Sequence, residues 1–327
     1  MPATMRSVFR SRYGGPEVLE VMELPRPSAG SGEVLVRVHA ATVNRTDCGG
    51  LWGAPFVYRL FAGLRAPRHV ATGSDFAGQI AEVGAGVTEF RVGDRVFGFD
   101  DNGAGTHAEY LRFSTRKAII GIPVGLSFAE AAACAEGAHY ARNFLRKVPL
   151  AAGQKALVNG ATGAIGSAAV QLLKSHGVHV TATCATPHLA LVRSLGADHV
   201  IDYLVEDFTR TDARYDFVFD AVGKSSFGAC KPILGPRGIY ISSELGPHAE
   251  NLYLPLLTSF RRQKVRFPLP IDIKASLLLI RSLVEQGKFR PVIDPVINRS
   301  YGLDQIREAF TYVASGQKIG NVVLSIA

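Results

Sequence analysis

The sequence predicts an α/β protein in which a doubly wound parallel sheet follows a β-rich region, and two observations support this. From residue 155 onward, strand-like and helix-like segments alternate, as they do in a parallel sheet with crossover helices. Before residue 125, short strand-like runs are separated by glycine and proline, which is typical of a small curled barrel with many bends. The chain has 327 residues, 47% of them apolar and 20% charged, so it is long enough for two hydrophobic cores.

The β-rich region contains the clearest strand of the chain. Residues 33–40 (EVLVRVHA) alternate so that small apolar side chains occupy one face. Shorter strands are predicted at 80–86 and 90–97, each beside a glycine turn. Residues 51–64 hold several large apolar side chains without a regular period. They fit a wall or lid over a pocket as well as a buried excursion that packs on the barrel.

A capping box, SFAE at 127–130, begins an alanine-rich run that predicts one long helix to about Arg146 and entry into a second domain. The strands of the parallel sheet are then expected at 156–159, 178–183, 199–201, 216–219 and 238–242, with helices at 163–175 and 187–195. Further helices are predicted at 271–287 and 304–316, and a closing strand at 320–326. This tail lacks a glycine turn of its own, so we expect it to rejoin the first domain. The expected boundaries are 1–124, 125–264 and 265–327.

The most informative stretch is LVNGATGAIG at 157–166, which runs from a strand through a glycine turn into a helix. Gly163 and Gly166 lack the Cβ atoms that would block a diphosphate or hold the helix away from the strand. The helix N-terminus offers unpaired N–H groups and the positive end of a dipole. We therefore expect a nicotinamide cofactor here, in contact with Thr162, Ala164 and Ile165 as well; a glycine turn kept for packing alone is the alternative.

The second strand of the sheet bears on the choice of cofactor. In such sheets an acidic side chain at the end of this strand holds the ribose hydroxyls and repels a 2′-phosphate. Residues 179–186 (HVTATCAT) end without one. Thr183, Thr186 and His188 are candidate donors to a 2′-phosphate, which favours NADPH over NADH. Thr186 is followed by proline and so is also a good helix N-cap, and the two roles are compatible.

Bulk properties narrow the class of protein. The net charge is +8, and the basic residues are scattered except for 261–266 (RRQKVR), which fits a solvated loop better than a phosphate or nucleic-acid patch. The four cysteines show neither close pairing nor a Cys-x-x-Cys motif, so no disulfide framework or zinc knuckle is indicated. We find no signal-peptide pattern or apolar run of about 20 residues. A cytoplasmic protein without a membrane segment is expected.

Several motifs occur together in one order: GSDFAG (73–78), VGAGV (83–87), VGDRV (92–96), GATGAIG (160–166), LGAD (195–198) and FDAVG (219–223). In this combination the chain resembles the medium-chain dehydrogenase/reductase family, in its zinc-independent quinone reductase and enone reductase branch. The resemblance covers nearly the whole chain. It implies a Rossmann-type cofactor domain, a GroES-like barrel catalytic domain built from the N- and C-terminal parts, and an active-site cleft between them.

Zinc-dependent members of the family carry a cysteine where this chain has Asn44 and a histidine where it has Ser74. Asparagine and serine are neutral and weak ligands, whereas zinc prefers thiolate, imidazole and carboxylate. The segment 97–115 also lacks the cysteines of the family's structural zinc loop. We therefore expect no zinc and no other metal.

Without a Lewis acid, reduction of a polarised acceptor is better supported than oxidation of an alcohol. By resemblance, Asn44 and Thr46 face the nicotinamide: Asn44 as a hydrogen-bond donor to a carbonyl oxygen, and Thr46 as the hydroxyl that relays protons in zinc relatives. Each has a plain structural alternative, since Asn44 also fits a turn and Thr46 a helix cap. Arg45 fits a contact to the diphosphate or an ordinary surface position.

The remaining cofactor contacts are implied by the resemblance or by positions at the ends of strands: Tyr140, Tyr203, Val222, Ser242, Ser243 and Asn321. Tyr140 departs from the threonine that relatives carry, and Asn321 stands where a lysine is commoner. His107 and His139 are assigned structural roles.

Together these observations predict a cytoplasmic, metal-free, NADPH-dependent reductase of α,β-unsaturated carbonyl compounds or quinones. The nearest alternative is an alcohol dehydrogenase or carbonyl reductase of the same fold. A third is an NADPH-binding protein of low turnover that uses the basic run 261–266 to bind RNA. We expect a small hydrophobic carbonyl or quinone substrate and neither a membrane nor a nucleic acid as partner, and a homodimer is left open.

Overall fold

The computed structural model describes residues 3–294 and 301–326. The chain divides into two compact units. The first consists of Met1–Glu136, Ile273–Glu285 and Arg290–Ala327, and the second of Gly137–Asp272 and Gln286–Phe289. Across the described residues, no helix combines the length and the apolar surface needed to cross a bilayer.

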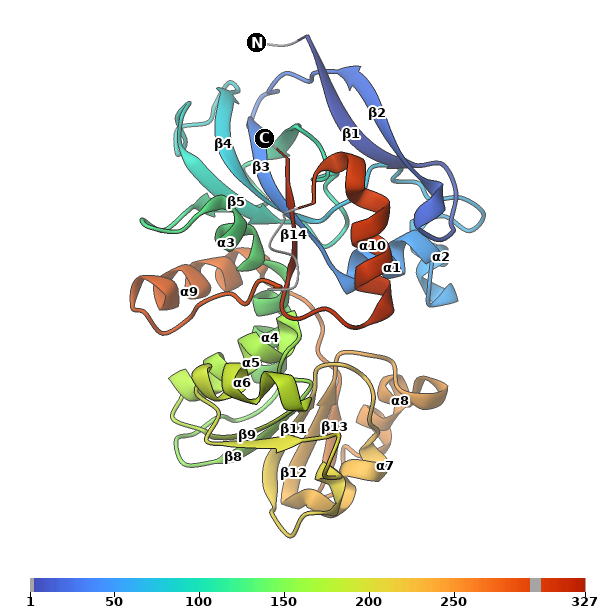
Figure 1. The fold of residues 1–327 in the computed structure, drawn as a ribbon, viewed down its shortest axis with the longest axis vertical. Helices are drawn as coiled ribbons and strands as arrows, with labels where there is room; N and C mark the ends of the chain where they lie inside the picture. Colours follow the sequence, from blue (N-terminus) through green and yellow to red (C-terminus); the bar gives the residue numbers. More distant parts are fainter. Residues whose placement is uncertain (1–2, 295–300, 327) are drawn as a thin grey trace. The chain divides into compact units, whose positions relative to one another are not determined.

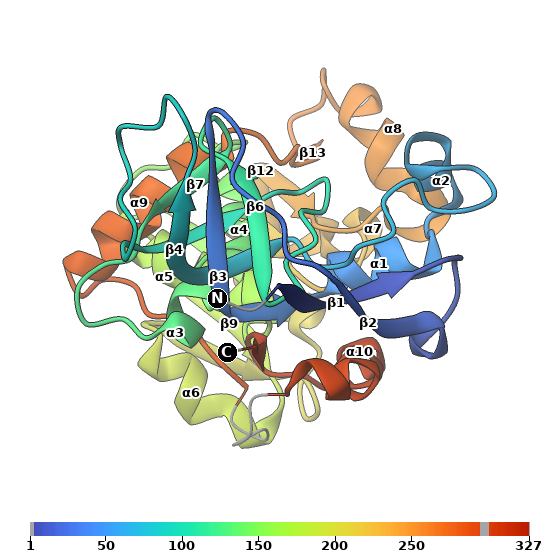
Figure 2. The same cartoon turned by 90° about the horizontal axis from the view of Figure 1, so that it is seen from above.

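The first unit is built on a curled antiparallel sheet, which bears out the expected GroES-like barrel (Figure 1). Its strand order is β14-β3-β4-β5-β7, and β6 pairs with β3 (Figure 2). The strands are β3 (Glu33–Val43), β4 (Asp75–Val83), β5 (Arg95–Phe99), β6 (Tyr110–Ser114), β7 (Ala118–Gly121) and β14 (Val322–Ser325). A separate hairpin pairs β1 (Thr4–Arg10) with β2 (Leu19–Pro25). β14, near the end of the chain, lies antiparallel to β3 and so belongs to the first unit.

The helices of the first unit are α1 (Arg45–Trp52), α2 (Phe56–Ala62), α3 (Phe128–Ala133), α9 (Ile273–Glu285) and α10 (Ile306–Ser315). Of these, α3, α9 and α10 pack against strands of the sheet. In α10 the residues Ile306, Ala309, Phe310 and Val313 are buried, and this spacing places them on one helical face. They join the alternating valines of β3 in one hydrophobic core.

The single long helix predicted after Ser127 is wrong, although its capping box is confirmed. Ser127 Oγ accepts the backbone N–H of Glu130 at 3.2 Å, but α3 ends at Ala133 and α4 (Glu136–Leu145) begins separately. Residues 131–135 are all small and all buried. Tertiary packing therefore overrides the helix propensity of the alanine run, which alone would predict continuity.

The second unit contains the predicted doubly wound sheet, and all of its ladders are parallel. Its order is β10-β9-β8-β11-β12-β13, so the winding reverses between β8 and β11. The strands are β8 (Lys155–Asn159), β9 (His179–Cys184), β10 (His199–Asp202), β11 (Tyr215–Asp220), β12 (Leu234–Ser242) and β13 (Lys264–Arg266). Its helices are α4, α5 (Ala164–Ser175), α6 (Leu189–Ser194), α7 (Phe227–Cys230) and α8 (Glu250–Leu257). The Rossmann-type fold class is confirmed.

The predicted strand at 90–97 and the predicted loop at 261–266 are both partly wrong. The strand predicted at 90–97 begins only at Arg95, because Gly93 has φ +96° and the Asp94 carboxylate accepts the Arg91 N–H at 2.8 Å, which closes a turn. The basic run predicted as a loop contributes its last three residues to β13, which forms the edge of the parallel sheet.

Candidate active site

The glycine turn after β8 has the shape that a diphosphate needs. Gly160 adopts φ +82°, and Gly163 caps α5 with extended backbone. A Cβ on Gly166 would collide with the carbonyl oxygen of Gly160, so only glycine lets the helix start this close to the strand. Thr162 and Ile165 are half-buried beside the opening of α5. The turn therefore fits the phosphates of a dinucleotide, and the same glycines also serve packing.

A buried polar network supports the turn from behind. Thr183 Oγ1 accepts the Gly160 N–H at 3.0 Å and donates to Asn159 Oδ1 at 2.7 Å. Asn159 Nδ2 in turn donates to Asp220 Oδ1 at 3.0 Å. Thr183 is fully buried, and its one hydroxyl proton is given to Asn159. Its contribution to the cofactor site is therefore to hold the glycine turn in place.

Asp220 is the centre of this network and was missed in the sequence. Its carboxylate accepts the N–H groups of Gly223 and Ser225, both at 3.0 Å, and the Tyr240 hydroxyl at 3.1 Å. Ser243 donates its backbone N–H to the Asp220 carbonyl oxygen at 3.1 Å. β8 and β11 are apolar strands that each end in a polar residue, Asn159 and Asp220. Because the carboxyl ends of parallel strands meet at one edge of a sheet, this pattern could have predicted that the two side chains meet.

Thr186, a predicted contact to the 2′-phosphate of NADPH, lies in a different local structure from the one predicted. Thr186 does not cap the following helix: it lies within a 3₁₀ turn whose N-cap is Ala185, and no side chain caps that turn. Its hydroxyl donates to Asp202 at the end of β10. An acidic side chain, absent from the end of β9, is thus present at the end of the neighbouring strand β10. His188 is half-buried at the same edge.

In the first unit, Asn44 and Ser74 lie side by side, with Asn44 Nδ2 donating to Ser74 Oγ at 3.2 Å. Asn44 also caps α1, because its Oδ1 accepts the Asp47 N–H at 2.9 Å. Ser74 Oγ donates to Asp47 Oδ1 at 3.4 Å. Asn44 and Ser74 are only 2% and 3% exposed, so these contacts form a buried polar cluster.

These donors do not fit the zinc ion of the family's metal-dependent members. The Asn44 amide and the Ser74 hydroxyl are neutral and are engaged with each other and with Asp47. Among residues 3–294 and 301–326, no three histidine, cysteine or acidic side chains are grouped so as to hold a metal ion.

A second buried carboxylate lies beside this cluster. Asp75 accepts both the N–H and the hydroxyl of Thr42, at 2.7 and 2.6 Å. Burial raises the pKa of Asp75 to about 6, against the lowering effect of these hydrogen bonds. Burial, and after it the neighbouring charge of Asp75, raise the pKa of Asp47 to about 8. His107 also contacts Thr42, with its Nε2 2.9 Å from the Thr42 carbonyl oxygen. Burial lowers the pKa of His107 to about 4.

Thr46 connects the surface to a third buried carboxylate. Its side chain is exposed, and Oγ1 donates to Glu136 Oε1 at 2.6 Å. Glu136 is only 5% exposed. No pattern in the sequence predicts this contact, since Glu136 follows the alanine run and lies ninety positions from Thr46.

The remaining candidate site residues belong to both units. Arg45 is exposed, with its guanidinium carbon 5.6 Å from the centre of the Trp52 ring. Asn321 is buried and donates from Nδ2 to the Val292 carbonyl oxygen at 2.9 Å. Others belong to the second unit. The ring of Tyr140 packs edge-on against His139, and Tyr203 is half exposed. Ser242 Oγ accepts the Glu244 N–H at 3.2 Å. Val222 contacts the turn, because a Cβ on Gly160 would collide with it.

Residues 51–64 are largely a surface feature. Phe56, Phe61 and Leu64 are 66%, 77% and 55% exposed, so the interpretation as a buried excursion is wrong for them. Leu51, by contrast, is buried in the core. The segment presents apolar side chains to solvent along α2, as a wall or lid would.

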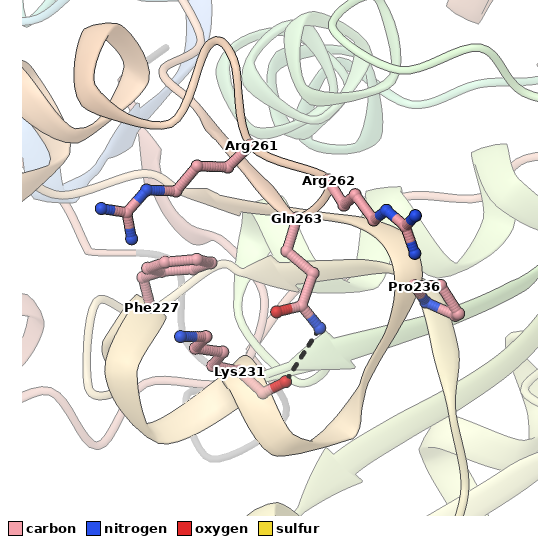
Figure 3. Close-up of a pocket in the computed structure, with 6 residues that line it drawn as sticks. All are labelled: Phe227, Lys231, Pro236, Arg261, Arg262 and Gln263. Carbon is pink, nitrogen blue, oxygen red and sulfur yellow. Dashed lines mark hydrogen bonds between the residues drawn. The ribbon is translucent and has the colours of Figure 1, made fainter.

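The basic run contributes to a pocket of about 310 Å³ in the second unit (Figure 3). Arg261 and Arg262 line it together with Lys231, Phe227, Pro236 and Gln263. Gln263 Nε2 donates to the Lys231 carbonyl oxygen at 3.2 Å and fixes the floor of the pocket. The pocket lies where β12 and β13 begin, whereas the glycine turn lies where β8 ends. The run is therefore partly an edge strand and partly a pocket rim.

Comparison with known proteins places this arrangement in context. Residues 30–143 match the alcohol dehydrogenase GroES-like domain, and residues 195–324 match the zinc-binding dehydrogenase domain. The chain is 32% identical to the chloroplast envelope quinone oxidoreductase homolog of Arabidopsis thaliana, over 97% of this chain and 96% of that protein. It is 28% identical to the NADPH-dependent alkenal/one oxidoreductase of the same plant, over 99% of this chain and 80% of that protein. The quinone oxidoreductase structure from Coxiella burnetii superposes with a TM-score of 0.86 at 25% identity, covering 99% of this chain and 100% of that one.

Proposed function

Because this chain belongs to the medium-chain dehydrogenase/reductase family, among its quinone and enone oxidoreductases, we propose that it is a metal-free, NADPH-dependent reductase of α,β-unsaturated carbonyl compounds or quinones. The family assignment makes it an oxidoreductase. The cofactor, the acceptor class and the independence from metal belong to the proposal.

The observation that carries the proposal is the buried contact between Asn44 and Ser74. Where zinc-dependent relatives hold a metal, this chain offers an amide and a hydroxyl. Such groups stabilise negative charge on a carbonyl oxygen by donating hydrogen bonds, whereas they activate a bound alcohol poorly. Reduction of a conjugated acceptor suits them, because the charge that arrives at carbon spreads onto an oxygen.

The glycine turn supports the choice of cofactor class. Gly163 and Gly166 leave room for a diphosphate at the start of α5, and the network through Thr183 and Asp220 holds that turn rigid. Bound NADPH supplies the hydride. Thr186 and His188 are the residues that we assign to the 2′-phosphate, and Asp202 opposes them with its negative charge, so we expect only a modest preference for NADPH.

Two side chains receive roles toward the substrate. Asn44 Nδ2 carries two N–H groups, one of which is donated to Ser74, and we assign the other to the substrate carbonyl oxygen. The exposed hydroxyl of Thr46 is assigned to protonation of that oxygen after hydride transfer. Asp47 fixes the position of both through the start of α1.

A turnover screen tests the proposal. The enzyme, treated exhaustively with a chelator, is assayed with alkenals, quinones and simple aldehydes, using NADPH and NADH. We expect a saturated carbonyl product from an enone, NADPH as the better donor, and no stoichiometric zinc by elemental analysis. An allylic alcohol as the main product would instead support carbonyl reduction. Activity that is lost on chelation and restored by zinc would contradict the metal-free assignment.

A further inference from the structure

The contact between Thr46 and Glu136 joins an exposed hydroxyl to a buried acid. Thr46 Oγ1 lies 2.6 Å from Glu136 Oε1; when Glu136 carries a proton, its O–H can donate to Thr46 Oγ1 over this distance, which frees the Thr46 proton for the substrate. Among the residues described, no cation lies within ion-pair distance of Glu136. A buried carboxyl without a paired cation favours its neutral, proton-bearing form.

The charged and titratable groups around Glu136 come from several elements. On α1 lie Asp47 and Cys48, on β4 lies Asp75, and before β14 lies Lys318. Burial raises the pKa of Glu136 well above its usual range, and the negative charges of Asp47 and Asp75 raise it further. The hydrogen bond from Thr46 and the charge of Lys318 act in the opposite direction. Burial in turn lowers the pKa of Lys318, which weakens that opposition.

The proposed reaction needs such an acid. Hydride transfer to an enone leaves an enolate, whose oxygen must be protonated for turnover. A threonine hydroxyl can hand over its proton only if another group replaces it at once, because the free alkoxide is too basic. The acid that replaces it works best when its proton affinity matches the working pH.

We propose that Glu136 is the proton reservoir of the reduction and delivers its proton through Thr46. This inference rests on the proposed function. As the Thr46 O–H bond breaks and its proton joins the enolate oxygen, the Glu136 O–H bond breaks and its proton joins Thr46 Oγ1. The substrate leaves as the enol, which becomes the saturated ketone, and Glu136 remains as a carboxylate that takes a proton from water. Glu136 acts through Thr46 and does not itself touch the substrate.

The test uses Glu136→Gln, which keeps the side-chain volume and an acceptor for Thr46 but has no acidic proton. Steady-state turnover with saturating NADPH and a saturating enone is followed between pH 5 and 9 for the full chain, because protonation comes after the hydride transfer that consumes NADPH. In the parent, the turnover rate falls as pH rises through the titration of Glu136. In Glu136→Gln, we expect a rate about 100-fold lower at low pH and no such pH step. Glu285→Gln, which changes an exposed acid of α9, is the matched control and should keep the parental profile.

Two further measurements guard against a purely structural effect. Thr46→Val, at an exposed position, should lower the rate by the same factor as Glu136→Gln, and the double variant should lose no more, since the two groups act in series. Thr46→Ser should restore the rate. In the cofactor-free protein, ¹³C NMR of labelled glutamate should show one carboxyl with a raised pKa that rises further in Thr46→Val, because the lost hydrogen bond favours the charged form.

The outcomes separate the two proposals. A parent that reduces enones while Glu136→Gln keeps its rate and pH step overturns the relay but leaves the reductase standing. A parent that reduces neither enones nor quinones overturns the proposed function, and the relay with it. An unshifted glutamate signal also contradicts the relay, whatever the activity.

Discussion

Asn44 and Asp47 cap each other at the start of α1. Asn44 Oδ1 accepts the Asp47 N–H at 2.9 Å, and Asp47 Oδ2 accepts the Asn44 N–H at 3.0 Å. One asparagine therefore both begins the helix and offers an amide to the site, so a substitution that removes it changes two properties at once.

We expect Asn44→Ala to lower the single-turnover rate of hydride transfer about 100-fold, because one hydrogen-bond donor to the developing oxyanion is worth about 3 kcal/mol. The affinity for NADPH should change by no more than about threefold, since the glycine turn belongs to another unit. The lost cap should also cost about 1 kcal/mol of unfolding free energy. Asn44→Ser separates the effects: serine caps the helix but lacks the amide, so stability should recover and the rate should not. An unchanged rate in both variants would remove Asn44 from the mechanism.

Asp75 predicts a pH dependence of stability. Its pKa is raised from 3.8 to about 6 in the folded protein, so between these values the folded state holds a proton that the unfolded state has lost. The contribution of Asp75 to stability then falls as pH rises from about 4 to about 6 and falls no further above pH 6. Relative to Asp75→Asn, the parent should lose up to about 3 kcal/mol over this interval, at about 1.4 kcal/mol for each tenfold change in proton affinity.

The measurement is urea denaturation at intervals from pH 4 to 8. His107 acts with the opposite sign over nearly the same interval, since its lowered pKa makes the folded state more stable as pH rises from about 4 to its ordinary value of 6.5. Its contribution is common to both proteins and cancels in the comparison. A difference that is flat with pH would show that Asp75 remains charged when buried.

Asp202 predicts a change in nucleotide choice. In Asp202→Asn, the repulsion between this carboxylate and a 2′-phosphate disappears, so NADPH should bind about two- to fivefold tighter, as expected for an exposed charge pair worth less than about 1 kcal/mol. NADH binding should not tighten. Fluorescence titration at low and high salt measures both, and the gain should shrink at high salt. Asp198→Asn removes the same charge at the other end of β10 and should leave the ratio unchanged. Equal gains for both variants would mean that only net charge matters.

The different surroundings of Gly163 and Gly166 predict different effects of an alanine substitution at each position. Gly166→Ala should destabilise the protein by about 1–3 kcal/mol and abolish nucleotide binding, because the new Cβ meets the backbone of Gly160. Gly163→Ala should fold normally, since its nearest new contact is 3.7 Å away, and should only weaken nucleotide binding by crowding the phosphates. Thermal unfolding with and without NADPH distinguishes them. A stable Gly166→Ala protein that binds NADPH would contradict the close approach of helix and strand.

The sequence was sufficient for those features that depend on neighbours along the chain. The parallel sheet and the glycine turn follow from periodicity and from Gly163 and Gly166, and the capping box at Ser127 follows from a spacing of three residues. Family motifs supplied the antiparallel first domain, whose tail joins β3 through β14.

What the sequence could not predict depends on partners far apart in the chain. Glu136 lies ninety positions from Thr46, and Asp220 is linked to the turn through Asn159, sixty-one positions away. Asp202 does not follow from the sequence of β9, because it ends the neighbouring strand, and only the fold places the ends of these two strands at the same edge. The break between α3 and α4 was missed because alanine propensity is continuous there and only packing interrupts it.

The pairing of β14 with β3 orders events during synthesis. β3 and its neighbours β4 and β6 leave the ribosome early, but β14, which pairs with residues 40–43 of β3, follows only after the whole of the second unit has been made. The second unit is nearly continuous in sequence and can fold while translation proceeds. The edge of β3 at residues 40–43 meanwhile stays open, exposing backbone hydrogen-bonding groups to other nascent chains. Protection from aggregation in the cell is therefore needed most in the first unit, during the interval before the last strand emerges.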